Sequence, residues 1–228
     1  MVSFILLAAG KGSRVEQKMP KQYVSIAGKP LLLHVLDKLT KIQEIDQLII
    51  CCELEYSGLI DTMIANHYPG LAYELIEGGA TRQQSVWHGL QVCKNETVVI
   101  HEAARPFVRT KDFLRLIQDE MPNVIYGADI PFTVLKGKEF VEDVLKRDEL
   151  VNVQLPQKFV TSRLKEAYKK ALANKQEFTE DAGLFYTYCE AEKIKVLKGL
   201  QYNIKVTYPI DFLVGEVIYR EYIVGREE

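Results

Sequence analysis

The stretch LLAAGKGSRVEQKMPKQY, residues 6–23, begins as a buried strand, breaks at two glycines and then gathers cations. Gly10 and Gly12 follow the apolar run directly, and glycines there let backbone N–H groups come close to a phosphate. Arg14 has the planar fork that binds two phosphate oxygens, and Lys21 can act as a mobile point charge. The stretch therefore predicts an anion-binding loop after the first strand.

The chain as a whole has no basic character that would explain these cations. Its 228 residues contain 29 Lys and Arg against 31 Asp and Glu, which gives a net charge of −2. This balance argues against a nucleic-acid partner or a charged membrane surface. The apolar runs, such as FILLAA, are far too short to span a bilayer.

The cysteines and the N-terminus predict a cytoplasmic protein. None of the four cysteines is in a C-x-x-C pattern, and Cys51 and Cys52 fall in an apolar strand. Buried free thiols in a reducing compartment are the expected reading. The first residues, MVSFILLAAGKG, lack a basic region and a small-residue cleavage site, so they predict a strand and not a signal peptide.

Strand and helix patterns alternate along the first 131 residues. Buried strands are predicted at 2–10, 46–53, 71–79, 96–106 and 123–131. Helices are predicted between them, at 29–42, 57–67, 81–93 and 110–121. Ser57, Thr81 and Thr110 are the expected N-caps of the last three helices. This rhythm predicts a doubly wound α/β fold with a mostly parallel sheet.

Three polar clusters follow strands directly, at residues 10–21, 78–85 and 101–106. Ligands of doubly wound sheets bind beyond the carboxyl ends of the strands. We therefore expect these clusters to meet at one edge of the sheet.

The pattern changes at residues 132–147, which read as two short strands around KGK, with Gly137 at the turn. We interpret this hairpin as an arm that projects from a single domain, 1–228, and serves in dimerisation. Helices at about 161–173 and 179–190, a strand at 193–199, a short strand at 202–206 and a terminal helix from Pro209 follow.

Two common phosphate motifs do not match the first loop. The P-loop needs G-x-x-x-x-G-K-[ST], which GKGS does not provide. The dinucleotide fingerprint needs glycine or alanine where Val15 stands, and Glu53 is too distant for the acid that binds the ribose. The pattern L-x-A-A-G-x-G-x-R with a downstream P-K-Q is instead typical of a nucleoside-triphosphate loop.

Five ordered motifs then resemble one family over nearly the whole chain. They are LLAAGKGSRV…MPKQY, GGATRQQSV at 78–86, HEAARPFV at 101–108, LPQ at 155–157 and NIKVT at 203–207. The family is the cytidylyltransferases that act on 2-C-methyl-D-erythritol 4-phosphate, with close relatives that act on ribitol 5-phosphate. The resemblance implies a Rossmann-like nucleotidyltransferase fold, a homodimer, and the substrates CTP and a polyol phosphate, with Mg²⁺ as cofactor.

The resemblance also implies roles for individual residues. Arg14, Lys21 and Lys205 match the cations that act on the phosphates in catalysis. Arg105, Thr133, Arg147 and Lys205 match the residues that bind the acceptor, and those of the arm reach the neighbouring subunit's substrate. The nucleotide-binding residues are Ala8, Ala9, Gly10, Lys11, Gly12, Gly79, Ala80, Ser85, Glu102 and Ala103. Glu102 is also the expected Mg²⁺ ligand.

The chain departs from the family pattern at three positions within these motifs and at one, Tyr202, directly before the last of them. Glu102 replaces the usual Asp, Ala80 and Tyr202 stand where acids are common, and Leu155 replaces a threonine. His101 has no base role to fill, because a phosphate nucleophile is already ionised at pH 7, so we interpret it as structural. Arg82 is expected to brace its loop.

Three functions remain open at this level. The function that we predict is transfer of CMP from CTP to methylerythritol phosphate, with release of pyrophosphate, which would serve isoprenoid precursors. The alternative is transfer to ribitol phosphate, which would serve a cell-wall polymer. A non-catalytic nucleotide-binding protein is the third reading. The presence of Arg14, Lys21, Arg147 and Lys205 together argues against that third reading, since nucleotide binding needs no second set of cations.

Overall fold

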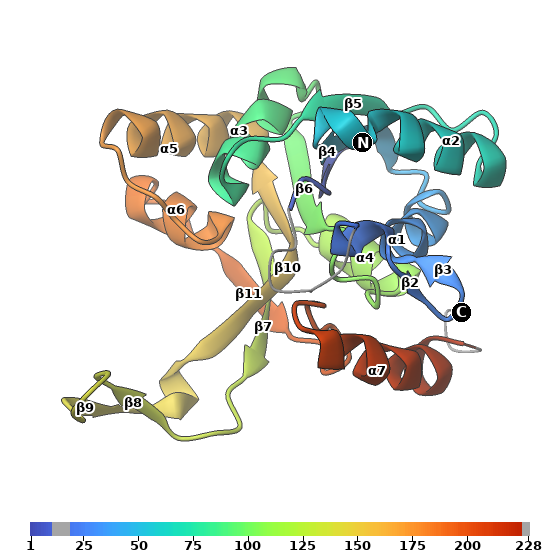
Figure 1. Cartoon of the computed structure of the whole chain (residues 1–228). Helices are drawn as coiled ribbons and strands as arrows, with labels where there is room; N and C mark the ends of the chain where they lie inside the picture. Colours follow the sequence, from blue (N-terminus) through green and yellow to red (C-terminus); the bar gives the residue numbers. More distant parts are fainter. Residues whose placement is uncertain (11–18, 225–228) are drawn as a thin grey trace.

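The computed structural model of the protein describes residues 1–10 and 19–224. Its centre is a seven-stranded sheet in the order β11-β7-β10-β6-β1-β4-β5 (Figure 1). Within this sheet β10 runs antiparallel to both neighbours, and the other pairings are parallel. The strands are β1 (Val2–Leu7), β4 (Ile45–Cys52), β5 (Glu74–Glu77), β6 (Thr97–Glu102), β7 (Val124–Asp129), β10 (Val151–Val160) and β11 (Lys195–Lys198).

Helices cover both faces of the sheet. The α-helices are α1 (Leu31–Leu39), α2 (Ser57–His67), α3 (Arg82–Val92), α4 (Thr110–Ile117), α5 (Thr161–Ala173), α6 (Asp181–Tyr188) and α7 (Pro209–Ile218). Shorter elements are the 3₁₀ helices η1 (Lys21–Tyr23), η2 (Leu54–Tyr56) and η3 (Arg147–Glu149), the π-helical turn η4 (Tyr219–Ile223) and the ribbon β2 (Ser25–Ile26) with β3 (Lys29–Pro30). Of the helices in the described residues, none is long and apolar enough to cross a membrane.

The alternation of side chains along β1 explains the two layers. All six of its residues are buried, as expected for a strand covered on both faces. Phe4 and Leu6 belong to the core formed with α1, α2 and α4. Ile5 and Leu7 belong to the core formed with α3, α5 and α6. The predicted doubly wound, mostly parallel α/β fold is therefore confirmed.

One strand of the sheet was not predicted from the sequence. Residues 151–160 form β10, between β6 and β7. Pro156 argues against a central strand, because proline has no N–H to donate to a neighbour. The structure accommodates it in a register shift between Gln154 and Gln157, where the pairing with β7 is interrupted.

Only one of the three predicted helix caps is correct. Thr81 caps α3, and its side chain accepts the N–H of Gln84. Ser57 is the first residue of α2, and its hydroxyl donates to the carbonyl of Leu54 at 2.7 Å. Helix α4 begins at Thr110 itself, so the N-cap is the residue before it. Both errors are shifts of one residue.

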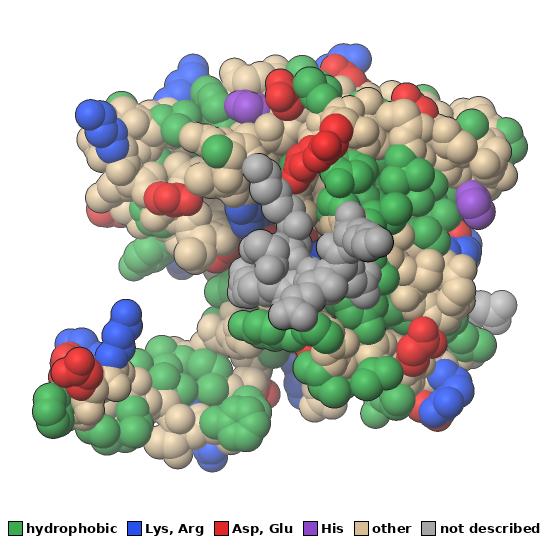
Figure 2. Space-filling model, in the orientation of Figure 1, with side chains coloured by type: hydrophobic (Ala, Val, Ile, Leu, Met, Phe, Trp, Pro, Cys, Tyr) green, Lys and Arg blue, Asp and Glu red, His purple; other side chains and the backbone are tan. Residues whose placement is uncertain are grey.

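The hairpin predicted at 132–147 is present as β8 (Val134–Lys136) and β9 (Asp143–Leu145), which form a sheet of their own. Gly137 adopts a φ of +118°, a conformation that favours glycine. The hairpin extends away from the body of the molecule, with hydrophobic side chains along it (Figures 1 and 2). Phe132 is 77% exposed and Phe140 is 81% exposed. We call residues 132–147 the arm.

Candidate active site

A cavity of about 690 Å³ opens at the carboxyl ends of the parallel strands. Its walls come from the segments that follow β1 (8–10), β4 (53–55) and β5 (78–82), from Glu102 at the end of β6 and Ala104 after it, and from Lys21 and Lys205. We call it the cleft. The predicted meeting of the polar clusters at one edge of the sheet is thus confirmed for these residues. Lys11, Gly12, Arg14 and Lys18 lie outside the described residues.

The segment after β1 forms one wall and is held by hydrogen bonds to its backbone. The N–H of Ala8 donates to the carbonyl of Cys51 at 2.7 Å, and Gln22 Nε2 donates to the carbonyl of Ala8 at 2.5 Å. A Cβ placed on Gly78 would lie 2.1 Å from the Cβ of Ala9. Glycine at position 78 is therefore what allows the two loops of this wall to touch.

The segment after β5 is fixed by side chains at the start of α3. Gly79 N–H donates to Ser85 Oγ at 3.0 Å, and Ala80 N–H donates to Gln84 Oε1 at 2.9 Å. Gly79, Ala80 and Ser85 all line the cleft. Because Ala80 is held through its backbone, the loop keeps its shape without an acidic side chain at that position.

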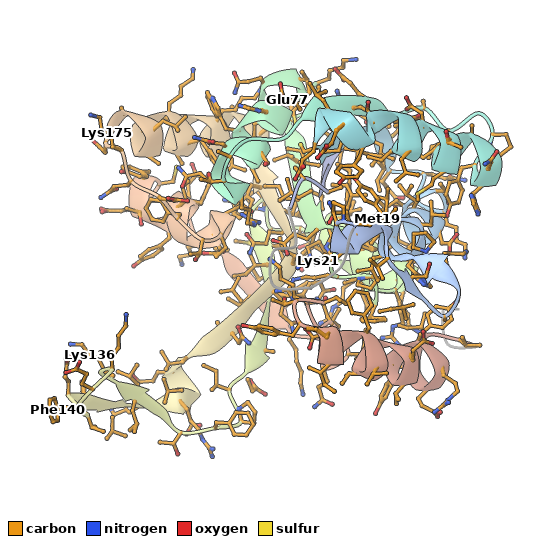
Figure 3. All side chains as sticks on the ribbon, viewed as in Figure 1. Met19, Lys21, Glu77, Lys136, Phe140 and Lys175 are labelled. Carbon is orange, nitrogen blue, oxygen red and sulfur yellow. The ribbon has the colours of Figure 1, made fainter. Side chains whose placement is uncertain are left out.

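Lys21 and Lys205 bring two positive charges to the same wall of the cleft. Lys21 is the first residue of η1, and its Nζ donates to the carbonyl of Val206 at 2.7 Å. Val206 is the chain neighbour of Lys205, and its own N–H donates to the carbonyl of Ala104 at 2.8 Å. Figure 3 shows Lys21 at the centre of the molecule, where the strands end. Two cations from distant parts of the chain thus converge.

Glu102, the last residue of β6, lies among three cations. Arg82 Nε is 2.9 Å from Oε1, Lys205 Nζ is 2.8 Å from Oε2, and Arg105 Nε is 3.8 Å from Oε2. Glu102 as a whole residue is only 7% exposed. Burial alone would raise the pKa of Glu102, but Arg82, Lys205 and Arg105 outweigh it and hold this pKa well below its usual value. Glu102 therefore stays ionised.

Two residues assigned from the HEAARP motif do not line the cleft. Ala103 is fully buried, and its N–H donates to the carbonyl of Leu7 at 3.0 Å, so Ala104 takes the place in the wall. Arg105 Nη1 donates to the carbonyl of Asn203 at 3.0 Å. In this structure Arg105 braces the segment that carries Lys205, because Nη1 bonds to the backbone of that segment and Nε lies near Glu102.

The arm residues Thr133 and Arg147 are not brought to the cleft of their own chain. Both are exposed, and Arg147 Nη1 donates at 3.1 Å to the carbonyl of Pro131, the residue just before the arm. Lys136 and Phe140, at the tip of the arm, lie far from Lys21 (Figure 3). A role for Thr133 and Arg147 in the site therefore requires that the arm of one chain reaches the cleft of another chain.

The segment 199–207 carries Lys205 without regular secondary structure, so the short strand predicted at 202–206 is wrong. Side chains hold its backbone instead. Gln154 accepts the N–H of Leu200 at 2.9 Å and donates to its carbonyl at 3.1 Å. Tyr202 donates to Asp112 Oδ2 at 2.6 Å, which gives the departure at position 202 a structural account.

Sequence reasoning also missed Asp181, a fully buried carboxylate that binds Arg82 Nη2 at 2.6 Å. It begins α6, and acids are common in the first turn of a helix, so no sequence signal separates it from an ordinary first-turn acid. The prediction that Arg82 braces its loop is in keeping with this contact, although Arg82 also lines the cleft.

Metal binding by the protein itself finds no support in the described residues. Among them, no group of three or more His, Cys, Asp or Glu side chains is arranged to hold a metal ion. Glu102 has both oxygens engaged by cations, and those charges repel a further cation. The residues present therefore do not fit a protein-bound Mg²⁺ at Glu102.

The structural reading of His101 is confirmed, because this side chain is fully buried in the core and does not line the cleft. Its ring packs edge-on against Phe4 and Phe113, and Nε2 bonds to the carbonyl of Arg105 at 3.0 Å. Burial lowers the pKa of His101 to about 3.

This pKa predicts a stability that falls on acidification. Below pH 6.5 the unfolded chain binds a proton at His101 that the folded chain excludes until about pH 3. The free energy of unfolding should therefore fall by about 1 kcal/mol per pH unit in the upper part of that window. Urea denaturation between pH 6.5 and 5 checks this. His101→Asn should flatten the slope, whereas His67→Asn, at an exposed position, should not.

Comparisons with known proteins agree with one another. Residues 2–221 match the family model described as 2-C-methyl-D-erythritol 4-phosphate cytidylyltransferase. The enzyme of that name from Clostridium novyi (strain NT) is 33% identical over 224 residues, covering 94% of each chain. The one from Geobacillus kaustophilus (strain HTA426) is 33% identical over 221 residues, covering 94% of this chain and 95% of that one.

Solved structures show the same likeness. The crystal structure of 4-diphosphocytidyl-2C-methyl-D-erythritol synthase from Anaerococcus prevotii DSM 20548 has a TM-score of 0.84 at 28% identity, covering 96% of this chain and 98% of that one. The 2-C-methyl-D-erythritol 4-phosphate cytidylyltransferase of Thermus thermophilus has a TM-score of 0.75 at 25% identity, covering 95% and 98%.

Proposed function

The chain belongs to the 2-C-methyl-D-erythritol 4-phosphate cytidylyltransferase family, and on that premise we propose how its own residues transfer CMP from CTP to the polyol phosphate. The products are a CDP-polyol and pyrophosphate. The observation that carries the proposal is that Lys21 and Lys205 line the same cleft as the loops after β1 and β5, with Lys21 bonded to the backbone next to Lys205. The relatives named above favour methylerythritol phosphate over ribitol phosphate as acceptor.

The nucleotide takes the side of the cleft made by the segments after β1 and β5. Ala8, Ala9 and Gly10 face the triphosphate and ribose, and Gly79, Ala80 and Ser85 face the base. Lys11, Gly12 and Arg14 belong to the same proposal from the sequence motif. Support for the placement comes from the contact between the two loops at Ala9 and Gly78, which makes a continuous wall.

The reaction is an in-line displacement at phosphorus. An oxygen of the acceptor phosphate forms a bond to the α-phosphorus of CTP, and the bond from that phosphorus to the bridging oxygen of pyrophosphate breaks. Negative charge shifts onto the leaving pyrophosphate during this step. Lys21 and Lys205 stabilise that charge because they are fixed in place before the reaction begins. No covalent enzyme intermediate is needed.

Use of a divalent metal ion is in keeping with a nucleotidyltransferase, and Mg²⁺ is our specific proposal. Since the described residues do not fit a protein-bound ion, we propose that Mg²⁺ arrives on the triphosphate oxygens. When bound, it would offset phosphate charge.

The arm completes the site from a second chain in this proposal. Two short strands with exposed apolar residues are marginal on their own and gain stability from a partner surface. Thr133 and Arg147 would then approach the acceptor phosphate bound by the partner, since a guanidinium fork suits a phosphate. A single domain with a dimerisation arm is the simplest organisation that fits. The cytoplasm as location remains a prediction from the four free thiols.

The function is tested by offering CTP and Mg²⁺ with a panel of acceptors and measuring pyrophosphate release. Methylerythritol 4-phosphate should be the best acceptor, with ribitol 5-phosphate and erythritol 4-phosphate as comparisons. A preference for ribitol 5-phosphate would instead identify the chain as a ribitol-5-phosphate cytidylyltransferase. Binding of CTP without pyrophosphate release for any acceptor would support the non-catalytic reading.

A further inference from the structure

Glu102 connects cations that come from three separate parts of the chain. Arg82 is the first residue of α3, Arg105 follows β6, and Lys205 lies in the segment before α7. Each approaches the same carboxylate, with Arg82 and Lys205 at opposite oxygens. A single buried carboxylate thus lies between the nucleotide loop after β5 and the lysine proposed to act on the phosphates.

The Arg82 side of this arrangement is rigid. Arg82 Nη2 binds Asp181 at 2.6 Å, and the buried Tyr168 hydroxyl donates to the other oxygen of Asp181. Asp181 is fully buried and Glu102 nearly so. These contacts fix the position of Glu102 from the side of α3, α5 and α6.

The Lys205 side is open. The Lys205 side chain is 39% exposed and lines the cleft. Without a partner, its ammonium could therefore adopt many positions in the solvent. The backbone of the segment is fixed next to it, through Val206 and Ala104 at 2.8 Å. Among the residues that the structure describes, Glu102 is the one whose side chain pairs with the Lys205 ammonium and so fixes its position in the cleft wall.

We propose that Glu102 is a positioning residue that holds the Lys205 ammonium for the reaction, and that it acts through Lys205 and not through a metal ion or the ribose. The inference rests on the proposed function of Lys205. Its physical basis is that a preorganised charge stabilises a transition state better than one that must first be ordered. The glutamate side chain reaches Arg82 and Lys205 at once, with 2.9 and 2.8 Å contacts. Aspartate is one methylene shorter.

A double-mutant cycle tests the proposal. Glu102→Gln should lower kcat by about 10- to 100-fold, the cost of a misplaced catalytic group. Lys205→Ala should lower it by about 10²-fold. The double variant should lie within about threefold of Lys205→Ala alone, because residues that act as one unit are not additive. Full additivity would overturn the inference.

Two further readouts separate the competing roles. The Mg²⁺ concentration at half-maximal activity and the preference for CTP over dCTP should both be unchanged in Glu102→Gln. A shift in the Mg²⁺ midpoint would show a metal ligand, and a lost preference would show a ribose contact, and either result overturns the inference. Asp119→Asn is the matched control, because Asp119 forms a 2.7 Å ion pair with Lys195 and does not line the cleft.

A second variant and the wild-type activity distinguish a folding defect from a failure of either proposal. If Glu102→Gln does not fold, Glu102→Asp keeps the charge among the cations and should show a smaller loss of kcat with the same non-additivity towards Lys205→Ala. A wild-type chain that releases no pyrophosphate with any acceptor would contradict the proposed function. An active wild type with additive variants would contradict only the role of Glu102.

Discussion

Replacement of Lys21 by alanine should lower turnover by about 10²-fold or more, since a fixed charge near developing negative charge contributes that much. Lys21 lines the cleft and is held at 2.7 Å from the carbonyl of Val206, beside Lys205. Its ammonium is therefore in place before substrate binds. Steady-state pyrophosphate release, with CTP and acceptor varied in turn, measures the effect.

Lys21→Ala should lower kcat strongly while it changes the free energy of unfolding only a little. Loss of the bond to Val206 should cost about 1 kcal/mol of unfolding free energy, the usual net value of one hydrogen bond. Lys170→Ala is the matched control, because Lys170 is an exposed lysine on α5 that pairs with Glu166. Near-normal turnover of Lys21→Ala would remove Lys21 from the catalytic machinery.

Mixing two weak variants should restore activity if the arm completes the partner's site. Arg147→Ala should raise the KM for the acceptor much more than the KM for CTP, because Arg147 is proposed to bind only the acceptor phosphate. After subunit exchange with Lys21→Ala, half of the dimers contain both chains. Each of these has one intact site, so the mixture should reach about a quarter of wild-type activity.

The same experiment also tests the alternative arrangement, in which each arm serves the site of its own chain. If each arm served its own chain, every site in the mixture would carry one defect and activity would stay at the level of the variants. Arg163→Ala is a suitable control for the loss of an arginine. Arg163 lies on α5, outside the arm, and pairs with Glu166 on the same helix and with Glu192 after α6. A wild-type chain that sediments as an active monomer would contradict the dimeric site.

The order of apolar and polar residues along the chain is enough to predict the layered fold and the general place of the site. Most of the strands and helices outside β10 were predicted from apolar runs and spacings that depend on near neighbours in the chain, although the short strands β2 and β3 were not. The buried run of β1 and the polar residues after β1, β5 and β6 are local features of this kind. Together they predicted that the polar clusters would meet at one edge of the sheet, where the strands end.

The contacts of the charged residues in the cleft, in contrast, follow from the folded structure. Lys21 and Val206 are 185 positions apart, and Arg82 and Asp181 are 99 positions apart, yet each pair is in direct contact. The same holds for β10, whose Pro156 breaks the local strand signal although β6 and β7 enclose it. Such contacts arise from packing between distant segments, on which local hydrophobic period and helix-capping patterns carry no information.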